Sequence, residues 1–498
     1  MPDNSAAWEP PLLNLGKQGD VMNTHDLSKL KGQRVPRGLL VLLAIALGLT
    51  LAVSLANAGK SGAWGASELQ LQNVDLQPRP VTTTFYAASG RPEPPITDLL
   101  AGGRSRFYSP TLPTGFTGTV SVDSPGQVLG VVTHIGDEGD DPPGAAQWPL
   151  IDDAELSNIA YVPRFFVPQT SGPASRLSIH NLASSNADIA MMFRDVQGQL
   201  YPRRINVPVS GTQFLDGAAL DLSPGFKGSA VISTTGPIYV GVDRIDRSRS
   251  AFSAAHAPAH GGFEIAAPLF FQSGDPKSTL IVQNTNSTLS ATGVLSYYAT
   301  SGKLLTAQPF TIEPFATFEW PGMAGSAQSF TSGHVVATAD QPIVGLVLGD
   351  SVQFLSMWDY TAVVAVPDKP DTLDRRAAYG PAAFYGYKGW TLSQVFIANL
   401  SSSPAFVDVE YSSALTGIVS PTQLIIPPHG LTETRLISPL SDFEHYSVSI
   451  LSDQPIAAVV GVFNLGLVDQ HMAYEAQYAS TVRTHPPPRR VYLPSIMK

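Results

Sequence analysis

The sequence predicts an all-β chain, a tandem array of four immunoglobulin-like β-sandwich domains of about 100 residues each, preceded by a hydrophobic export segment. The first observation is a seven-residue frame with Ser first, aliphatic residues third and fifth, and Asn seventh, which occurs four times. Its Asn residues are 108, 103 and 115 residues apart, and repetition at a near-fixed period indicates an array. The second is composition: 43 Gly, 42 Pro and only 14% charged residues favour short strands joined by turns. The copies of the frame are 67–73, 175–181, 278–284 and 393–399.

The second copy shows the strand pattern of one domain. Apolar and polar residues alternate between Gly- and Pro-containing turns, and seven short strands at about ten-residue spacing are typical of such a sandwich. All four copies have an aromatic residue 12 or 13 positions after the Asn, and three of the four have a Pro-Ile pair before the last strand. The expected strands are 161–167, 175–181, 189–194, 200–207, a short one at Phe214, 229–233 and 238–245, with a turn at Gly236-Pro237.

These landmarks place the domain boundaries. Linkers without strand patterning separate the domains. We expect these linkers to be exposed and the domains to make limited contact with one another. The domains are 64–136 (its first strand missing), 159–247, 264–366 and 377–480; the linkers are an acidic one at 137–158, an Ala/His/Gly-rich one at 248–262 and a charged one at 367–376.

The Asn that ends each frame is expected to open a turn. An Asn side chain can bond its own backbone two residues on, which ends a strand. Four ligand-binding Asn side chains are the alternative.

The N-terminus carries the export segment. Residues 1–38 form a polar leader with basic residues at its end, and 39–58 form an uncharged apolar run closed by Ala56-Asn57-Ala58. This order is typical of a signal peptide cleaved after Ala58, and an uncleaved membrane anchor is the alternative. Either interpretation places the rest of the chain outside the cytoplasm, secreted or in the cell envelope, with membrane contact only through this segment if it is uncleaved.

Charge and cysteine content exclude several classes of function. The net charge is −10 and no basic block is present, so nucleic acid is not an expected partner. The chain has no Cys, which removes disulfides, zinc–thiolate sites and thiol nucleophiles.

Calcium is the only cofactor that the sequence suggests. Asp137, Glu138, Asp140 and Asp141 gather in the first linker, and carboxylate oxygens are the ligands that Ca²⁺ prefers. The alternating Asp loop with a downstream Glu is absent, so a solvated acidic linker is the alternative.

No catalytic residues are predicted, and we expect no enzyme. Gly349-Asp350-Ser351 imitates a hydrolase motif but falls on the last strand of the third domain, without an Asp-x-x-His partner or a nucleophile elbow. His256 and His260 have the spacing of a helical metal pair, but Pro258 argues against a helix.

A glycan-binding patch is the alternative functional site. Tyr385, Tyr387 and Trp390 lie in a Gly-containing stretch that we expect to be a loop, where their rings could stack on sugars. Trp148, Trp320 and Trp358 are expected mainly in cores or between domains.

The chain resembles bacterial secreted and cell-surface proteins with tandem β-sandwich repeats that end in a Tyr-Leu-Pro-apolar-Lys tail, here 492–498. That resemblance implies a non-enzymatic surface or envelope protein with a structural or adhesive role, whose partners are other surface proteins or glycans. A carbohydrate-binding module array is the alternative, and an exported hydrolase using Ser351 is a third.

The C-terminal tail, 481–498, contains a spare strand. An apolar-Pro strand precedes three of the frames but not the first, whereas Val491–Pro494 has no frame after it. We expect this strand to pair with an exposed sheet edge, either within the chain or on another molecule, where it would cause self-association.

Overall fold

The computed structural model divides the chain into two units, Met1–Ala63 and Trp64–Lys498, and only residues of the second are described. The leader and the apolar run at 39–58 therefore lie outside the described residues. Within the described part, no helix has the length and apolarity needed to cross a membrane. The described residues are 67–108, 112–113, 116–136, 144–152, 156–272, 275–322, 332–351, 356–367, 373–387, 391–414, 419–435, 444–464, 472–480 and 489–497.

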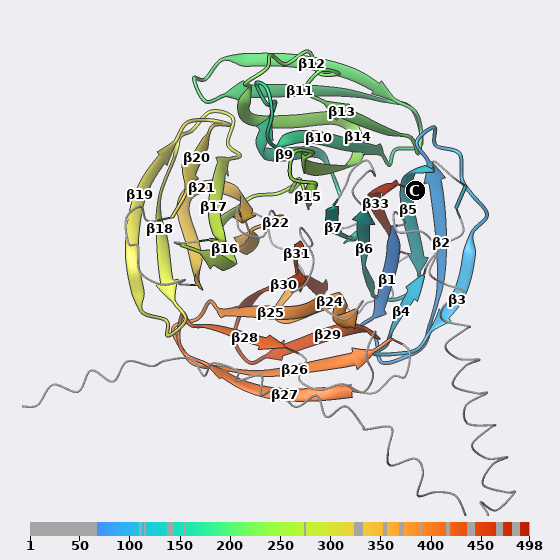
Figure 1. Cartoon of the computed structure of the whole chain (residues 1–498), viewed down its shortest axis with the longest axis vertical. Coiled ribbons are helices and arrows are strands. Elements are labelled where there is room, and N and C mark those ends of the chain that lie inside the picture. The colour runs from blue at the N-terminus through green and yellow to red at the C-terminus, as the bar shows by residue number, and fades with distance from the viewer. Residues whose placement is uncertain are drawn as a thin grey trace, which may run out of the picture. The chain divides into compact units, whose positions relative to one another are not determined.

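All regular elements of this part are β-strands, which confirms the predicted fold class (Figure 1). The first repeat contains β1 (Glu68–Asn73), β2 (Arg79–Ala87), β3 (Ile96–Leu100), β4 (Ser105–Tyr108), β5 (Thr117–Ser124), β6 (Val128–Gly136), β7 (Gly144–Pro149) and β8 (Ile151–Asp152). The second contains β9 (Ser157–Phe166), β10 (Ala174–Asn181), β11 (Ala187–Asp195), β12 (Leu200–Val207), β13 (Thr212–Asp216), β14 (Lys227–Asp246) and β15 (Ala251–His256).

The remaining strands belong to the third and fourth repeats and to the tail. The third repeat contains β16 (Gly262–Phe271), β17 (Lys277–Asn284), β18 (Ala291–Ala299), β19 (Leu304–Ile312), β20 (Thr317–Trp320), β21 (Ser332–Ser351), β22 (Ser356–Thr361) and β23 (Val363–Pro367). The fourth contains β24 (Leu373–Tyr387), β25 (Thr391–Asn399), β26 (Ala405–Ser413), β27 (Val419–Ile426), β28 (Leu431–Arg435), β29 (Glu444–Ser452), β30 (Ile456–Asn464), β31 (Met472–Glu475) and β32 (Gln477–Ser480), and the tail forms β33 (Arg489–Met497).

The second repeat shows how one sandwich is built. One sheet has the order β12-β11-β14-β9 and the other β13-β10-β14-β15, because the two halves of β14 lie in different sheets. Inward residues of both sheets, among them Ile179, Ile189 and Ile232, are fully or almost fully buried in one core. On β11, buried residues alternate with more exposed ones, as the period-2 pattern predicts.

The turn predicted at Gly236-Pro237 is wrong, because both residues lie inside the 20-residue strand β14. The pairing with β9 is irregular between Ser233 and Ile238, so the Pro sits where no regular ladder bond is needed. The third repeat has the same long strand in β21, whereas the first and fourth divide it into β5 and β6, and β29 and β30.

The frame Asn residues form the predicted turns. Each side-chain amide donates to backbone carbonyls across the turn, and each Oδ1 accepts from the backbone N–H two residues on. All four side chains are fully buried and bonded, so they are not available to a ligand. The four residues are Asn73, Asn181, Asn284 and Asn399.

The tail strand completes the first repeat within the same chain, which was one of the two predicted alternatives. β33 pairs antiparallel with β5, at the sheet position that β9, β16 and β24 hold in the other repeats. All four of these strands break register at a Pro and the residue after it: Pro163, Pro268, Pro381 and Pro494. The shared bulge identifies β33 as the missing first strand.

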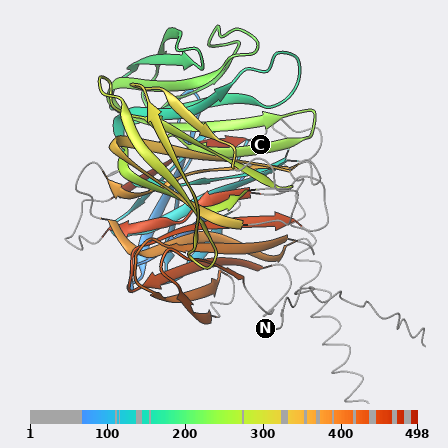
Figure 2. The ribbon, with the colours of Figure 1, turned by 90° about the vertical axis from the view of Figure 1, so that its left-hand side faces the viewer.

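The expectation that the domains make limited contact is wrong, since the repeats of the second unit contact one another in a closed cycle around a common centre (Figure 1). Main-chain bonds join neighbours, such as Thr212 N–H to the Ala88 carbonyl and Leu431 N–H to the Thr300 carbonyl. Figure 2 shows the same sheets from the side, with most strands running across the view.

The linkers are also not simple joints. The three expected linkers contain, in chain order, β7, β15 and the start of β24. Each of these strands is hydrogen-bonded to a repeat. β7, β15, β22 and β31 contact one another in a closed cycle. Burial of Trp148 and Phe252 on two of these strands explains why the segments are ordered.

Candidate functional site

The two faces of each frame strand contact different repeats. The third and fifth residues enter the core of their own repeat, whereas the sixth faces the preceding repeat. Gln72 donates to Ser449 Oγ at 3.1 Å, and Gln283 donates to the Ala230 carbonyl at 3.3 Å. In the second repeat His180 Nδ1 lies 3.4 Å from Thr119 Oγ1, and burial lowers the pKa of this imidazole to about 4. Polar groups at equivalent positions therefore join three of the frame strands to the preceding repeat, whereas the fourth has Ala398 at this position.

A buried ion pair joins the second and third repeats. Arg244 Nη2 lies 2.6 Å from Asp359 Oδ1, and its Nε lies 3.0 Å from the other carboxylate oxygen. Ser253 Oγ also donates to Asp359 at 2.6 Å, and Arg244 donates to the Gly349 carbonyl. Burial raises the pKa of Asp359, while the guanidinium opposes that effect. Full hydrogen bonding compensates for placing both charges inside the protein.

The centre of the cycle is filled by large side chains. Trp148 packs 5.5 Å from Phe252, ring centre to ring centre, and its Nε1 donates to Asp243. His256 Nδ1 lies 2.9 Å from Glu475 Oε1. Trp148, Trp320 and Trp358 are all buried, which confirms their expected packing role and removes them as sugar-stacking surfaces.

The predicted calcium and glycan residues are only partly described. Asp137, Glu138, Asp140 and Asp141 lie outside the described residues, and so does Trp390. The backbones of Tyr385 and Tyr387 belong to β24 and pair with Leu392 and Thr391 of β25. The loop expected at these two tyrosines is therefore a strand. The calcium and glycan sites remain predictions.

The other candidate chemical groups have structural partners. Ser351 is fully buried at the end of β21, and Asp350 forms a 2.6 Å ion pair with Arg249. His256 ends β15 rather than lying in a flexible linker, and contacts Glu475 and Thr361. Among the described residues, no group of three or more His, Asp or Glu could hold a metal.

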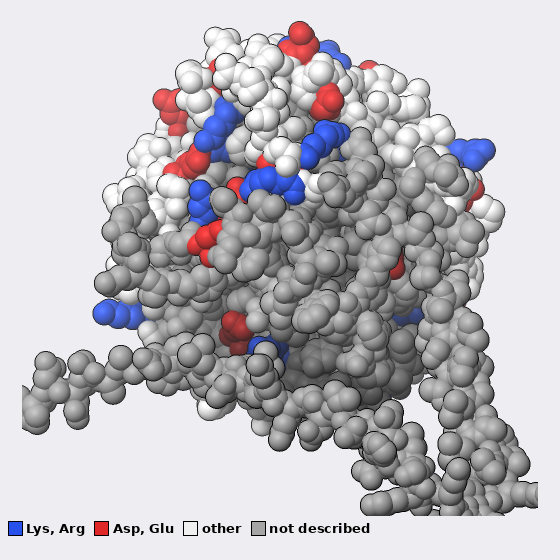
Figure 3. All heavy atoms as spheres, viewed as in Figure 1, with Lys and Arg blue, Asp and Glu red and all other residues white. Residues whose placement is uncertain are grey.

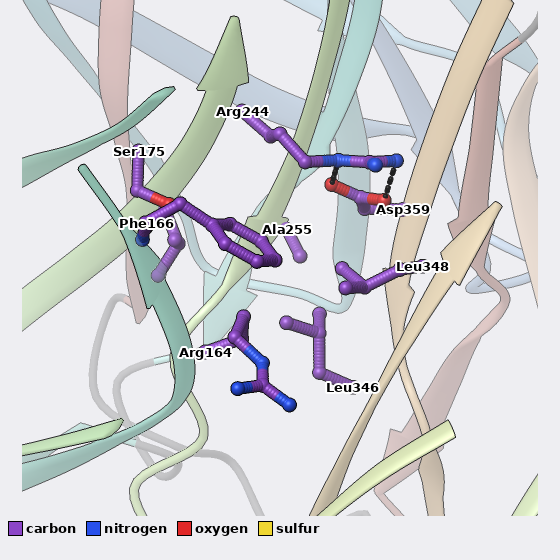
Figure 4. A pocket seen from close by; sticks show the side chains of 9 residues that line it. Arg164, Phe166, Ser175, Arg244, Ala255, Leu346, Leu348 and Asp359 are labelled. Atoms are coloured by element: carbon purple, nitrogen blue, oxygen red, sulfur yellow. Dashed lines mark hydrogen bonds and ion pairs between the residues drawn. The ribbon is translucent and has the colours of Figure 1, made fainter. Parts of the chain in front are cut away.

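A small cavity lies between the second and third repeats (Figure 4). It measures about 10 Å³, the space of roughly one water molecule. Arg164 and Arg244 reach it from β9 and β14, and Leu346 and Leu348 line it from β21. Sequence reasoning missed this site, because the residues that form it come from distant strands.

The described surface also has an exposed apolar patch, formed by Phe406, Ile425 and Leu451 on the fourth repeat. Phe406 of β26 is 60% exposed and lies directly opposite Ile425 of β27, which is 66% exposed. Leu451 of β29 is 50% exposed and lies opposite Asp408, which follows Phe406 by two residues on β26. Which apolar residues lie side by side on this surface depends on the register of the paired strands, which the sequence alone does not give.

The charged groups are distributed differently. On the face shown in Figure 3, Lys and Arg side chains of the described residues are interspersed with Asp and Glu. Several form ion pairs between repeats, such as Arg194 with Glu313. This arrangement favours contacts within the protein over attraction of a highly charged partner.

No family model and no curated protein matches the chain. Among solved structures, the crystal structure of Thermotoga maritima 1070 shares 15% identity over 18% of this chain and 81% of its own, with a TM-score of 0.17. The tetra-tandem repeat in the extending region of a large adhesion protein shares 12% identity over 84% of this chain and 96% of its own, with a TM-score of 0.12. At these scores, neither likeness carries an argument about function.

Proposed function

We propose that the chain is a non-enzymatic protein of the cell surface or envelope, exported through its N-terminal segment, with a structural or adhesive role. The exposed apolar patch carries this proposal. Phe406 and Ile425 are 60% and 66% exposed and lie opposite each other, whereas Phe263, the other exposed Phe among the described residues, is 39% exposed. Contiguous exposed apolar groups are typical of surfaces that bind another macromolecule.

The chemistry around the patch defines its partner. Asp408 is exposed beside Leu451, and Asp453 accepts a bond from the Phe406 N–H at 2.8 Å. An apolar centre with an acidic border fits a protein surface whose apolar side chains are bordered by Lys or Arg.

Adhesion to intact cells of the producing strain tests this function. We expect labelled protein carrying Phe406→Ser and Ile425→Thr to bind at least tenfold less than the unmodified chain. Leu304→Ser, which removes a 48% exposed leucine from the third repeat, is the matched control and should bind normally. Equal binding by all three proteins would refute the proposed contact surface.

Location is tested separately by external protease. We expect cleavage of the chain on intact cells, with a mature N-terminus near Gly59 if the segment is removed. Protection in intact cells and cleavage only after lysis would contradict export.

Glycan binding is the alternative outcome. Loss of binding to immobilised glycans in Trp390→Ala, with unchanged adhesion in the patch variant, would favour the carbohydrate-binding module array. Calcium is tested in the same assay by adding a chelator.

A further inference from the structure

A tyrosine closes the Pro bulge of the first strand in two repeats. The hydroxyl of Tyr360 accepts from the Leu269 N–H and donates to the Leu269 carbonyl, and Tyr474 does the same at Ala382. Tyr360 lies opposite Val347, and Tyr474 lies opposite Val460. Both tyrosines therefore come from the central strand that follows the repeat.

In the second repeat an alanine stands at this position. Val242, the counterpart of Val347 and Val460, lies opposite Ala255. The bulge residue that corresponds to Leu269 is Arg164. Ala255, Val242 and Arg164 all line the small cavity, so the cavity lies at the position where the third and fourth repeats have a tyrosine.

Arg164 is not fully bonded in this cavity. Its side chain is 1% exposed, and its Nη2 pairs with Glu319 Oε2 at 2.5 Å. Its Nε and Nη1 are buried and have no hydrogen-bond partner. Burial lowers the pKa of the Arg164 guanidinium, whose charge is poorly solvated. Unpaired buried N–H donors are costly and indicate a missing acceptor.

Local charge indicates what kind of acceptor is missing. Lys227 Nζ also lies 2.8 Å from Glu319 Oε2, so one carboxylate serves two cations. Arg244 and Asp359, on another wall, neutralise each other. Because Glu319 is shared, the buried Arg164 guanidinium is only partly compensated, and the remaining lining of the cavity is largely apolar: Phe166, Val242, Ala255, Leu346 and Leu348.

We propose that this cavity binds one halide-sized anion, with chloride as the physiological species, held by Nε and Nη1 of Arg164. The space of about one water molecule excludes phosphate and carboxylate ligands. An anion satisfies both donors and offsets the partly compensated charge of Arg164, whereas a water molecule satisfies only the donors. Because Arg164 and Glu319 belong to different repeats, the anion stabilises the contact between the second and third repeats.

Bromide provides the direct test, because its anomalous scattering locates it in a crystal. We expect a bromide peak beside Arg164 in crystals of the full chain grown in sodium bromide. We expect no peak there for Ala255→Tyr, which introduces the tyrosine that the third and fourth repeats have at this position, or for Arg164→Met. A site occupied only by water in the unmodified protein would overturn the proposal.

Thermal unfolding provides the solution test. At constant ionic strength, replacing gluconate by chloride should raise the Tm of the unmodified chain by several degrees, with half the effect at millimolar chloride. Arg164→Met and Ala255→Tyr should lose this response. Arg176→Met, which removes a guanidinium paired with Asp243 at 2.7 Å, is the control and should keep it. An equal chloride response in all four proteins would contradict a specific site.

Discussion

Breaking the Arg244–Asp359 pair should destabilise the junction of the second and third repeats. Both residues are at most 5% exposed, and the guanidinium makes two contacts with the carboxylate, at 2.6 and 3.0 Å. Asp359→Asn keeps the shape of the side chain but removes its charge. The Arg244 cation would then remain buried with neutral acceptors only, the Gly349 carbonyl and the amide oxygen of the new Asn.

The cost follows from desolvation. Removing one partner of a buried ion pair costs about 3–5 kcal/mol, because the other charge is left uncompensated. Replacing both partners by apolar residues of similar volume is often neutral or stabilising by about 1–4 kcal/mol. We therefore expect Asp359→Asn to lose about 3–5 kcal/mol, and Arg244→Met with Asp359→Leu to recover most of that loss.

Urea unfolding followed by tryptophan fluorescence measures both variants, and Trp358 of the same strand lies close to the pair. Arg244→Met, Asp359→Leu and their double variant form a thermodynamic cycle with the unmodified chain, whose coupling energy should reach several kcal/mol. A loss below about 1 kcal/mol in Asp359→Asn, or additive losses in the double variant, would refute the assignment of a desolvated pair.

Four further changes test the fold. Asn399→Ala leaves buried turn carbonyls without a donor and should cost about 2–4 kcal/mol in thermal unfolding; an unchanged Tm would refute the turn role. Tyr474→Phe should cost about 1–3 kcal/mol in urea unfolding, because the bulge at Ala382 loses its hydroxyl. The low pKa of His180 keeps it neutral in the folded state, so stability should be constant above pH 6.5 and fall by about 3 kcal/mol towards pH 4; urea titrations at several pH values should show a smaller fall in His180→Gln. Deleting 489–498 exposes the edge of β5, so light scattering should show self-association and calorimetry a lower Tm; no change in either would contradict the role of β33.

Local pattern was enough to find most strands of the second repeat and the turns at the frame Asn residues. In the second repeat, alternation at 189–194 and 200–207 predicted β11 and β12 to within two residues. The Asn role was also predictable, since it depends on backbone groups within a few residues. The spare tail strand was recognised because the first repeat lacked one.

Placement of the candidate sites was not predictable in the same way. The sequence could not show that Phe406 and Ile425 face solvent together, because their neighbourhood depends on the register of two strands. The partial bonding of Arg164 depends on Glu319, 155 residues away. Tyr385 and Tyr387 were expected in a loop because of nearby Gly residues, but pairing with β25 extends the strand through them.

The sequence by itself determined the all-β class, the four repeats, the turns at the frame Asn residues and the unmatched strand, because period-2 burial and turn chemistry act over a few residues. Only the tertiary structure decided that β14 runs through both sheets, that expected linkers become central strands, and that β33 returns to the first repeat. These features depend on contacts between residues far apart in the chain. Their free energy comes from burying apolar surface and pairing strand edges between repeats, which no local pattern encodes.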